Sequence, residues 1–309
     1  NVFLMEAFMY RTHPQTANIL NNLDFILDCN KKILIEASFG FKAEVPDGHR
    51  LRNPNLGGGA ILDVGCYPLT MCKLIAGHLQ GLPFADPLSL EAEGALDDTG
   101  VDLKSNAHLI FADNIEARIS CAIDKELPNH LVISSGSNAI TVSEPWHCGQ
   151  FQEGQSSIIL SDANGVYKTI NVDDEVGLFT REIEHAADSI LNKDLESNLI
   201  PHAETQSNMF WLDQWREEMK IDCPKNYLKN SPILKSNAFI GRSASLENRG
   251  IPGLNKLGSR LALGCDNQTS DLHAFTMFDH FYGSGGRIFD TAYIYNNGMG
   301  DKYLGDWIN

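Results

Sequence analysis

A carboxylate and a phenol stand four residues apart in this chain, directly after a run of glycines. The stretch reads Leu56-Gly57-Gly58-Gly59-Ala60-Ile61-Leu62-Asp63-Val64-Gly65-Cys66-Tyr67-Pro68. On a helix, Asp63 and Tyr67 would share one face, because positions i and i+4 are neighbours on a helix surface. Such a pair can take or give the hydroxyl proton that must move when hydride leaves or reaches a carbinol carbon. The pattern therefore predicts a catalytic pair for alcohol or carbonyl chemistry.

The three glycines suit a loop that lies against a flat ligand, since they allow backbone dihedrals and close approaches that side chains forbid. Gly58 and Gly59 are therefore candidates to contact a cofactor, and Arg50, ahead of the loop, is a candidate to reach its phosphate. Arginines before a loop are also common on protein surfaces. A structural interpretation stays open, in which the glycines simply lead into a helix.

In that structural interpretation, Asp63 caps the helix and Tyr67 packs as a buried aromatic residue. Pro68 bears on both interpretations, because inside a helix it removes the hydrogen bond to the carbonyl of Val64. The side chains of Asp63 and Tyr67 can share a face only if the helix begins late or kinks here.

A second acid and phenol lie near the C-terminal end of the chain, in Arg287-Ile288-Phe289-Asp290-Thr291-Ala292-Tyr293-Ile294-Tyr295. Asp290 is expected to end a strand, and Tyr295 to lie in the loop after it. Barrel enzymes of alternating strands and helices build their active sites in such loops. Taken alone, the segment is equally typical of a strand followed by a turn through Asn296-Asn297-Gly298.

Alternating apolar residues predict an open, mainly antiparallel sheet in the first two thirds of the chain. Residues 33–45 alternate strictly, as a half-buried strand does. Two further alternating stretches, 109–123 and 158–172, are each interrupted by turn residues and predict hairpins. The turns are expected at Asp113-Asn114 and at Asn164-Gly165, whose residues tolerate positive φ.

Two stretches with helical spacing follow, over residues 179–191 and 205–219. Both helices are expected to cover one face of the sheet, which makes this part an α+β domain. Periodicity then fades into Pro, Asn, Ser and Lys over residues 223–254. The sequence therefore predicts a first domain at 1–222, a linker at 223–254 and a second domain at 255–309.

The second domain reads as strand, helix, strand, helix, at residues 259–264, 271–282, 287–290 and 299–308. This order is typical of βα units with a parallel sheet. Two units cannot close a barrel of eight, so we expect the incomplete start of a (β/α)8 barrel. The chain also begins without Met and stops inside a predicted helix, so both ends are expected to be cuts in a longer protein.

Composition narrows the classes of partner. The chain has 309 residues, 43% of them hydrophobic and 21% charged, with a formal net charge of −16, and nothing in it favours disorder. Because this charge repels phosphate backbones and no Lys/Arg cluster offsets it, nucleic acid is not expected as a partner. Neither a membrane segment nor a secretory signal is predicted. The seven cysteines form no CxxC pair, so we expect no metal site, no disulfides and a cytoplasmic location.

Three segments in the right order resemble the glucose-fructose oxidoreductase and inositol dehydrogenase family. They are Leu4 to Pro14, Arg50 to Pro68, and Arg181 to Glu184 with the following helix. The resemblance covers about residues 1–222. It implies the family's C-terminal domain, an open, largely antiparallel sheet with helices on one face. It also implies a homo-oligomer contact through the other face of the sheet.

The resemblance gives Asp63 and Tyr67 the family's catalytic roles, and Tyr at the second position is similar to the dihydrodiol and sugar dehydrogenase branches. It implies a sugar-like, polyol or dihydrodiol substrate and an NAD or NADP cofactor. Arg11 and His13 are candidates to contact the substrate, with a salt bridge as the alternative for Arg11. Glu6, alone among apolar residues, is expected to be a buried, hydrogen-bonded structural carboxylate.

The resemblance also implies a nucleotide-binding domain ahead of Asn1, with a GxGxxG fingerprint and a Glu-Lys-Pro motif. The triplet Gly57-Gly58-Gly59 is no such fingerprint, and no dinucleotide unit begins the chain. The main cofactor site is therefore expected outside this chain.

The second domain resembles the start of the aldo-keto reductase family, through Leu257 to Gly264 and the Phe-Asp-Thr-Ala-x-x-Tyr pattern ending at Tyr295. The resemblance implies that Tyr295 is a general acid, that Asp290 pairs with a Lys that lowers the pKa of this Tyr, and that Gly264 lies at the cofactor. Cys265 stands where Thr is commoner. The Lys and the His would lie beyond Asn309, so this second site is expected to be inactive.

Together these patterns predict the substrate-side fragment of a nicotinamide-dependent oxidoreductase, fused to a truncated reductase and inactive alone. Two alternatives stay open. Either only the first module of the parent is catalytic, or residues 1–222 form a sheet for binding or oligomerisation without chemistry, followed by a vestigial reductase segment.

Overall fold

The chain forms two compact units, Asn1–Cys223 and Pro224–Asn309. The computed structural model describes residues 2–27, 31–44, 46, 48–149, 155–173, 176–221, 246–268, 270–292 and 295–308. Each unit has its own hydrophobic core. Residues 248–250 form a strand of the second unit, although they fall within the predicted linker.

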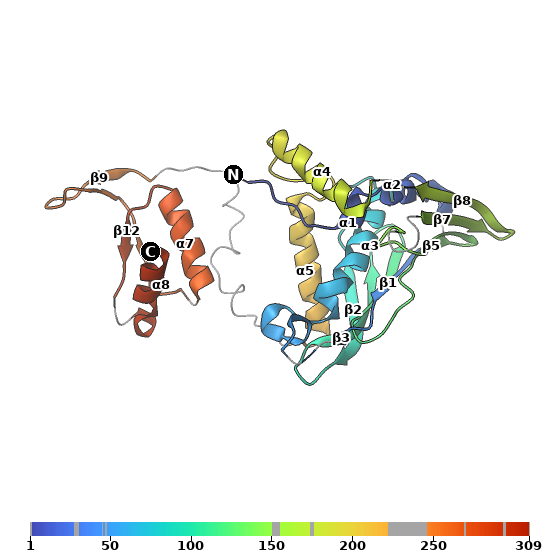
Figure 1. The fold of residues 1–309 in the computed structure, drawn as a ribbon, viewed down its shortest axis with the longest axis horizontal. Helices are drawn as coiled ribbons and strands as arrows, with labels where there is room; N and C mark the ends of the chain where they lie inside the picture. The colour runs from blue at the N-terminus through green and yellow to red at the C-terminus, as the bar shows by residue number, and fades with distance from the viewer. Residues whose placement is uncertain are drawn as a thin grey trace. The chain divides into compact units, whose positions relative to one another are not determined.

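An eight-stranded sheet dominates the first unit (Figure 1). Its strands are β1 (Ile33–Gly40), β2 (Ser89–Leu96), β3 (Asp102–Ile110), β4 (Ile115–Ala122), β5 (Leu131–Ser135), β6 (Asn138–Val142), β7 (Gln155–Asp162) and β8 (Gly165–Asp173). The spatial order is β2-β3-β4-β1-β5-β6-β7-β8, and every neighbouring pair is antiparallel except β1 with β4. The prediction of a mainly antiparallel sheet is confirmed.

Both predicted hairpins are present. Asp113 and Asn114, at φ of 58° and 61°, connect β3 to β4. In the second hairpin, Asp162 pairs with Gly165, so the connecting residues are 163–164 and Gly165 opens β8 at φ 111°. The turn therefore lies one residue earlier than the Asn-Gly pair indicated.

The strand predicted over 33–45 is shorter than its alternation suggested. β1 ends at Gly40, whose backbone N–H donates to Asn129 Oδ1 at 2.7 Å instead of continuing the ladder. The side chain of Leu127 fills the space beside Gly40, since a Cβ there would lie 2.5 Å from it. Val45 lies outside the described residues.

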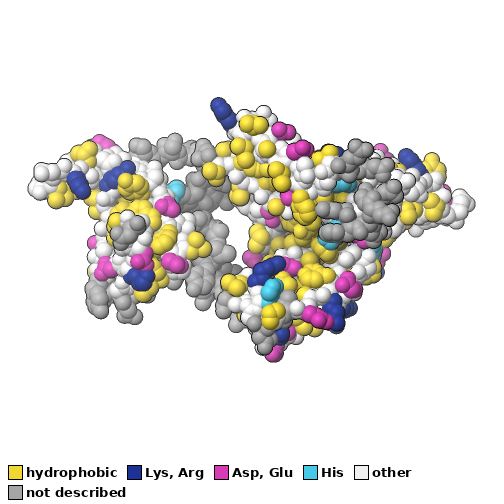
Figure 2. All heavy atoms as spheres, viewed as in Figure 1, with side chains coloured by type: hydrophobic (Ala, Val, Ile, Leu, Met, Phe, Trp, Pro, Cys, Tyr) yellow, Lys and Arg dark blue, Asp and Glu magenta, His cyan; other side chains and the backbone are white. Residues whose placement is uncertain are grey.

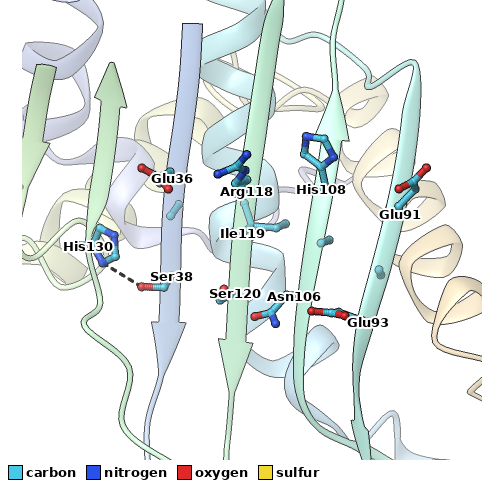
Figure 3. Close-up of a pocket in the computed structure, with 13 residues that line it drawn as sticks. Glu36, Ser38, Glu91, Glu93, Asn106, His108, Arg118, Ile119, Ser120 and His130 are labelled. Carbon is cyan, nitrogen blue, oxygen red and sulfur yellow. Dashed lines mark hydrogen bonds between the residues drawn. The ribbon is translucent and has the colours of Figure 1, made fainter. Parts of the chain in front are cut away.

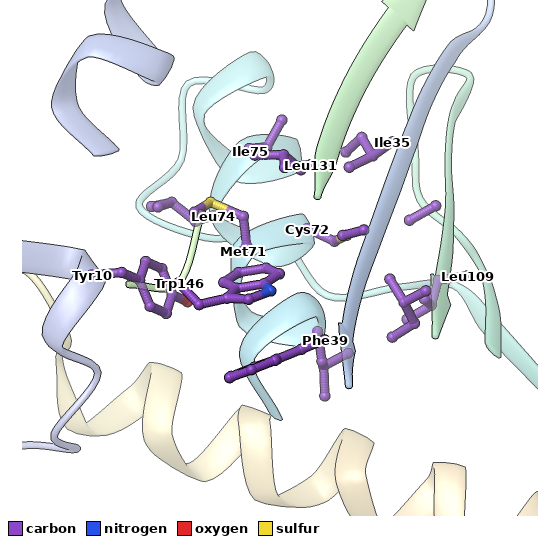
Figure 4. Packing of buried hydrophobic residues seen from close by; sticks show 14 of the residues in the cluster. Tyr10, Ile35, Phe39, Met71, Cys72, Leu74, Ile75, Leu109, Leu131 and Trp146 are labelled. Carbon is purple, nitrogen blue, oxygen red and sulfur yellow. The ribbon is translucent and has the colours of Figure 1, made fainter. Parts of the chain in front are cut away.

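The α-helices described in the first unit are α1 (Met9–Thr12), α2 (Pro14–Asn21), α3 (Cys66–Leu79), α4 (Leu178–Leu191) and α5 (His202–Glu218). α3 lies on β1 and β4, and α5 lies on β2. Figure 4 shows α3 turning Cys72 and Ile75 toward Ile35 of β1, with Trp146 and Tyr10 beside Met71. Trp146 is also fixed by a 2.8 Å hydrogen bond from its Nε1 to the Ser38 carbonyl.

The prediction that α4 covers the sheet is wrong. This helix packs against α1, and its inner face carries the buried Leu178 and Ser189 with Glu182 half-buried between them. The apolar stripe points outward instead, and Ile183 is 66% exposed and Leu191 78% exposed. Figure 2 shows hydrophobic side chains at the surface over α4. Helical periodicity located the helix, but it could not show which face the tertiary structure would bury.

The second unit contains the predicted strand-helix-strand-helix order. Its strands are β9 (Asn248–Gly250), β10 (Leu257–Ser259), β11 (Ala262–Gly264) and β12 (Ile288–Asp290), and its helices are α7 (Asp271–Gly283) and α8 (Met299–Ile308). β11 and β12 pair in parallel, with α7 between them along the chain. β9 and β10 form a separate antiparallel pair. A barrel is not shown by these elements.

The α+β class predicted for the chain is confirmed by this architecture. Across the described ranges, no helix combines the length and apolar character that spanning a bilayer requires.

The outward apolar face of α4 leads to a stability prediction. Ile183→Ala should change the free energy of unfolding by less than about 0.5 kcal/mol, as expected for an exposed side chain. Leu212→Ala, at a buried position of α5, should cost about 2–5 kcal/mol because it leaves a cavity in the core. Urea unfolding of both variants measures the difference. Equal losses would contradict the assigned orientation of α4.

Candidate functional site

The catalytic pair predicted from sequence straddles a change in helix type. Asp63 belongs to a π-helical turn, η4 (Ile61–Gly65), and Tyr67 is the second residue of α3. Pro68 therefore falls in the first turn of the α-helix, where a missing N–H is best tolerated. The expectation that the α-helix begins late is met, and the wider turn accommodates the proline.

The triple-glycine loop packs against the protein itself. A Cβ at Gly58 would lie 2.7 Å from the Arg50 carbonyl, and one at Gly59 would lie 2.1 Å from Asp102 Oδ1. Gly58 and Gly59 are both buried. The sequence suggested that these glycines lie close to a cofactor. In the structure they lie close to the backbone and to a carboxylate of this chain. Gly58 and Gly59 therefore offer no open cradle for a dinucleotide.

Asp102, at the start of β3, was not singled out from sequence. Its Oδ2 accepts a 2.6 Å hydrogen bond from the backbone N–H of Ile61, at the beginning of the π-helical turn. The residue is 1% exposed, and burial raises the pKa of its carboxyl to about 6, against the lowering effect of the Ile61 N–H. A single acidic residue at the start of a strand forms no recurring pattern in the sequence. The contact between Asp102 and Ile61 is therefore visible only in the folded chain.

Asp63 lies beside a cation. Arg50 Nη1 stands 2.9 Å from Asp63 Oδ1, and the side chains are 63% and 14% exposed, respectively. The guanidinium predicted to reach a cofactor phosphate thus contacts the carboxylate of Asp63. An ion pair with one exposed partner contributes little to stability, but it orients the carboxylate.

Tyr67 is half-buried within a cluster of aromatic rings. Its ring lies 5.1 Å from that of Phe39 and 5.4 Å from that of Phe8, both edge-on, with Tyr10 and Trp146 slightly farther away. Its hydroxyl donates to Met9 Sδ at 3.6 Å, a weak acceptor. The structure thus combines the packed aromatic of one interpretation with a phenol that has no strong hydrogen bond.

The electrostatic environment of Tyr67 is negative. Burial, together with smaller contributions from Cys66, Asp63 and Glu182, raises the pKa of the phenol to about 12. The hydroxyl consequently stays protonated at neutral pH. Glu182 lies on α4, within the Arg181 to Glu184 segment that carries part of the family resemblance.

Arg11 and His13 are held inside the fold. Arg11 Nη1 donates to Glu204 Oε1 at 2.5 Å, and Nη2 donates to the Leu199 carbonyl at 2.5 Å. Both members of this ion pair are buried. His13 Nδ1 accepts the backbone N–H of Gln15 and caps α2. The salt bridge that the sequence left open for Arg11 is therefore the contact observed.

Glu6 has the hydrogen bond that was expected of it. Its Oε2 accepts from Asn208 Nδ2 at 3.0 Å, and Asn208 Oδ1 in turn accepts from Lys73 Nζ at 2.9 Å. Lys73 is fully buried and also lies 3.3 Å from Asp86. This network ties the segment before α1 to α3 and α5.

In the second unit, Tyr295 donates from its hydroxyl to Asp290 Oδ2 at 3.5 Å, just after β12. Asp290, and to a smaller extent Asp266, raises the pKa of this phenol. That direction is opposite to the one a neighbouring Lys would produce. The carbonyl of Gly264 accepts a hydrogen bond from Gln268, and Gly264 pairs with Asp290 between β11 and β12.

A separate polar hollow of about 550 Å³ lies on the open face of the sheet, away from α3 (Figure 3). Arg118 stands in one row across the sheet between Glu36 of β1 and His108 of β3, and Glu91 ends the row. Ser38 contacts His130 Nδ1 at 3.2 Å one row below. The sequence showed this face only as the polar half of an alternation.

No residues described in the two units group three or more His, Cys, Asp or Glu as metal ligands would.

Comparison with known proteins extends these observations. The chain is 28% identical over 231 residues to trans-1,2-dihydrobenzene-1,2-diol dehydrogenase of Xenopus tropicalis, which covers 72% of this chain and 65% of that protein. It is 30% identical over 125 residues to D-xylose 1-dehydrogenase (NADP(+)) 2 of Haloferax volcanii, covering 40% of this chain and 35% of the relative. No family model matches.

These relatives are dehydrogenases. Among solved structures, the aldose-aldose oxidoreductase of Caulobacter crescentus, complexed with glycerol, superposes with a TM-score of 0.56 at 18% identity, over 71% of this chain and 62% of that one. At this identity the likeness shows the fold alone. The chain covers just under two thirds of the first relative's length. The relatives named here give no support for the aldo-keto reductase resemblance.

Asp102 should make stability depend on pH. Its carboxyl pKa of about 6 exceeds the unfolded value of about 3.9, so the folded chain binds an extra proton between these values. The free energy of unfolding should therefore fall by about 3 kcal/mol as the pH rises through this window. Asp102→Asn should remove that component, which urea unfolding at several pH values measures. An unchanged pH dependence in the variant would contradict the assignment.

Asp63 should help to keep the Tyr67 phenol protonated. Asp63→Asn removes one of the negative charges that raise the pKa of Tyr67, so that pKa should fall. Ultraviolet titration of tyrosinate, with Tyr67→Phe to identify the signal, measures it. Asp98→Asn, at an exposed carboxylate outside this set of charges, serves as the control. If the pKa of Tyr67 is the same in wild type, Asp63→Asn and Asp98→Asn, the charge of Asp63 does not act on the Tyr67 phenol.

Proposed function

We propose that residues 1–222 are the substrate-side domain of an NAD(P)-dependent oxidoreductase that acts on a sugar, polyol or dihydrodiol. One observation carries the proposal: the hydroxyl of the half-buried Tyr67 has only the Met9 thioether as a hydrogen-bond partner among the described residues, and the charge of Asp63 acts on this phenol. The names of the relatives support it, since they act on a dihydrodiol and a sugar. Membership of the glucose-fructose oxidoreductase and inositol dehydrogenase family is part of this proposal.

In this proposal Tyr67 acts as the proton donor. Because its phenol is protonated at neutral pH, it can give the proton to a substrate oxygen as a carbonyl becomes an alcohol. In the opposite direction the tyrosinate of Tyr67 takes the hydroxyl proton back, and Asp63, held by Arg50, contributes negative charge that favours the protonated phenol. The surrounding rings of Phe8 and Phe39 keep the phenol in one position.

The NAD or NADP cofactor would be held by a nucleotide-binding domain outside the described residues, because Gly58 and Gly59 give it no cradle. NADP is favoured by the name of the xylose dehydrogenase relative. The chain alone is proposed to be inactive. The second unit is proposed as a βα segment of an aldo-keto reductase, on the parallel β11–β12 pair and the Asp290–Tyr295 contact.

A non-catalytic role is the second candidate. The polar hollow around Arg118 favours a binding or oligomerisation surface on the open face of the sheet. Pairing of two copies through this face stays a prediction. The two candidate functions differ in whether Tyr67 matters for turnover.

Tyr67→Phe tests the catalytic role in the full-length protein that contains this chain. Loss of the proton donor should lower turnover about a hundredfold or more, with substrate affinity little changed. Nicotinamide absorbance with sugars and vicinal diols as substrates gives the rate, and Tyr167→Phe, at an exposed tyrosine of β8, is the matched control. Wild-type turnover in Tyr67→Phe would remove Tyr67 from the mechanism and favour the non-catalytic candidate.

A further inference from the structure

A second polar hollow, of about 540 Å³, lies where α4 ends. Its lining comes from the last two turns of this helix and from the loop 192–201 that follows, and we call it the α4 hollow. Its polar side chains include His185, Asp188, Ser189, Asp194, Glu196 and Ser197. It shares no lining residue with the hollow around Arg118, and Tyr67 does not line it.

The α4 hollow is negatively charged. Among the residues that the structure describes, none that lines it is Lys or Arg, and the carboxylates of Asp188 and Asp194 make no ion pair or hydrogen bond. Glu196 accepts the backbone N–H of His202 at 2.6 Å. The C-terminal end of a helix adds partial negative charge, and the last turn of α4 has no basic residue to offset it. The hollow therefore favours a positively charged ligand.

A buried hydroxyl lines the same hollow. Ser189 is only 7% exposed, yet its Oγ forms no hydrogen bond with any residue in the described ranges. A serine inside a helix can donate to the carbonyl four residues earlier, and Ser189 does not make this bond to His185. Because buried polar groups are rarely left without a partner, this hydroxyl indicates a ligand group that reaches the α4 hollow.

Hydrogen bonds fix the walls of the α4 hollow. Ser197 is fully buried, and its Oγ lies 2.7 Å from His185 Nε2 and accepts the backbone N–H of Ile200. The backbone N–H of Asp194 donates to the Ser189 carbonyl at 2.9 Å. The loop is thereby joined to α4 before any ligand arrives, which lowers the entropy cost of binding.

We propose that the α4 hollow binds an alkylguanidinium, an organic cation with five N–H donors on one planar group. Its donors bond the exposed carboxylates of Asp188 and Asp194 and the buried Oγ of Ser189. A compact ammonium has three donors, so it would leave more of these acceptors unpaired. Leu195, 48% exposed in the same lining, offers an apolar contact for the alkyl chain. The inference does not depend on the proposed function, because the two sites share no residue.

Calorimetric titration of the 309-residue chain tests the inference. The probes are N-butylguanidinium, the neutral N-butylurea of nearly the same shape, and N-butylammonium. Wild type should bind the guanidinium at least about tenfold more tightly than either other probe. Asp188→Asn and Asp194→Asn should each weaken guanidinium binding about tenfold, because each removes a charged acceptor. Glu184→Gln, at an exposed position of α4 outside the hollow, is the matched control and should match wild type.

Ser189→Ala removes the buried hydroxyl and leaves the charges in place, so it should weaken guanidinium binding at least about threefold. Circular dichroism checks that each variant folds. The inference is overturned if wild type binds no guanidinium, or binds the urea or the ammonium as tightly. It is also overturned if both aspartate variants keep wild-type affinity, or if Glu184→Gln loses as much affinity as they do, since that loss would be a general effect of surface charge.

Discussion

The contact between the Asp102 carboxylate and the start of the π-helical turn holds the candidate site in place. Asp102 comes from the sheet, and its two oxygens fill the space left by the absent side chain of Gly59 and accept the N–H of Ile61. A residue with a Cβ at 59 would collide with that carboxylate. The position of Asp63, two residues later, depends on this contact.

Negative charge defines the chemistry that the site can perform. Asp63, Glu182 and the buried surroundings all favour the protonated form of Tyr67. Each nearby carboxylate penalises tyrosinate, so the Tyr67 phenol is a weaker acid than a free tyrosine and gives up its proton less readily. Arg50 is the cation that directly contacts one of these carboxylates, and it is largely exposed. Among the groups that shift the pKa of Tyr67 in the described residues, none is a cation that would stabilise the deprotonated state.

The aromatic rings and the buried ion pairs serve a different purpose, which is to fix the backbone around Tyr67. Trp146 bonds to the Ser38 carbonyl of β1, and Phe39 next to it touches Tyr67 edge-on. The ion pair of Arg11 with Glu204 and the hydrogen bond from Lys73 to Asn208 join α5 to α1 and α3. Removing Glu204 would leave the charge of the buried Arg11 uncompensated. Residues that looked like substrate ligands in the sequence therefore act as part of the support.

The sequence by itself determined the features that depend on local periodicity and turn chemistry. Alternation gave the strands of the antiparallel sheet, Asp113-Asn114 gave the turn of a hairpin, and Pro68 forced the late start of α3. Tertiary structure alone decided where the side chains went. It turned the polar face of α4 inward, engaged Arg11 with Glu204, and set Asp102 against Gly59. These contacts join residues up to 193 positions apart, and no spacing rule reaches that far, because such pairs are chosen by packing and by the need to satisfy buried polar atoms.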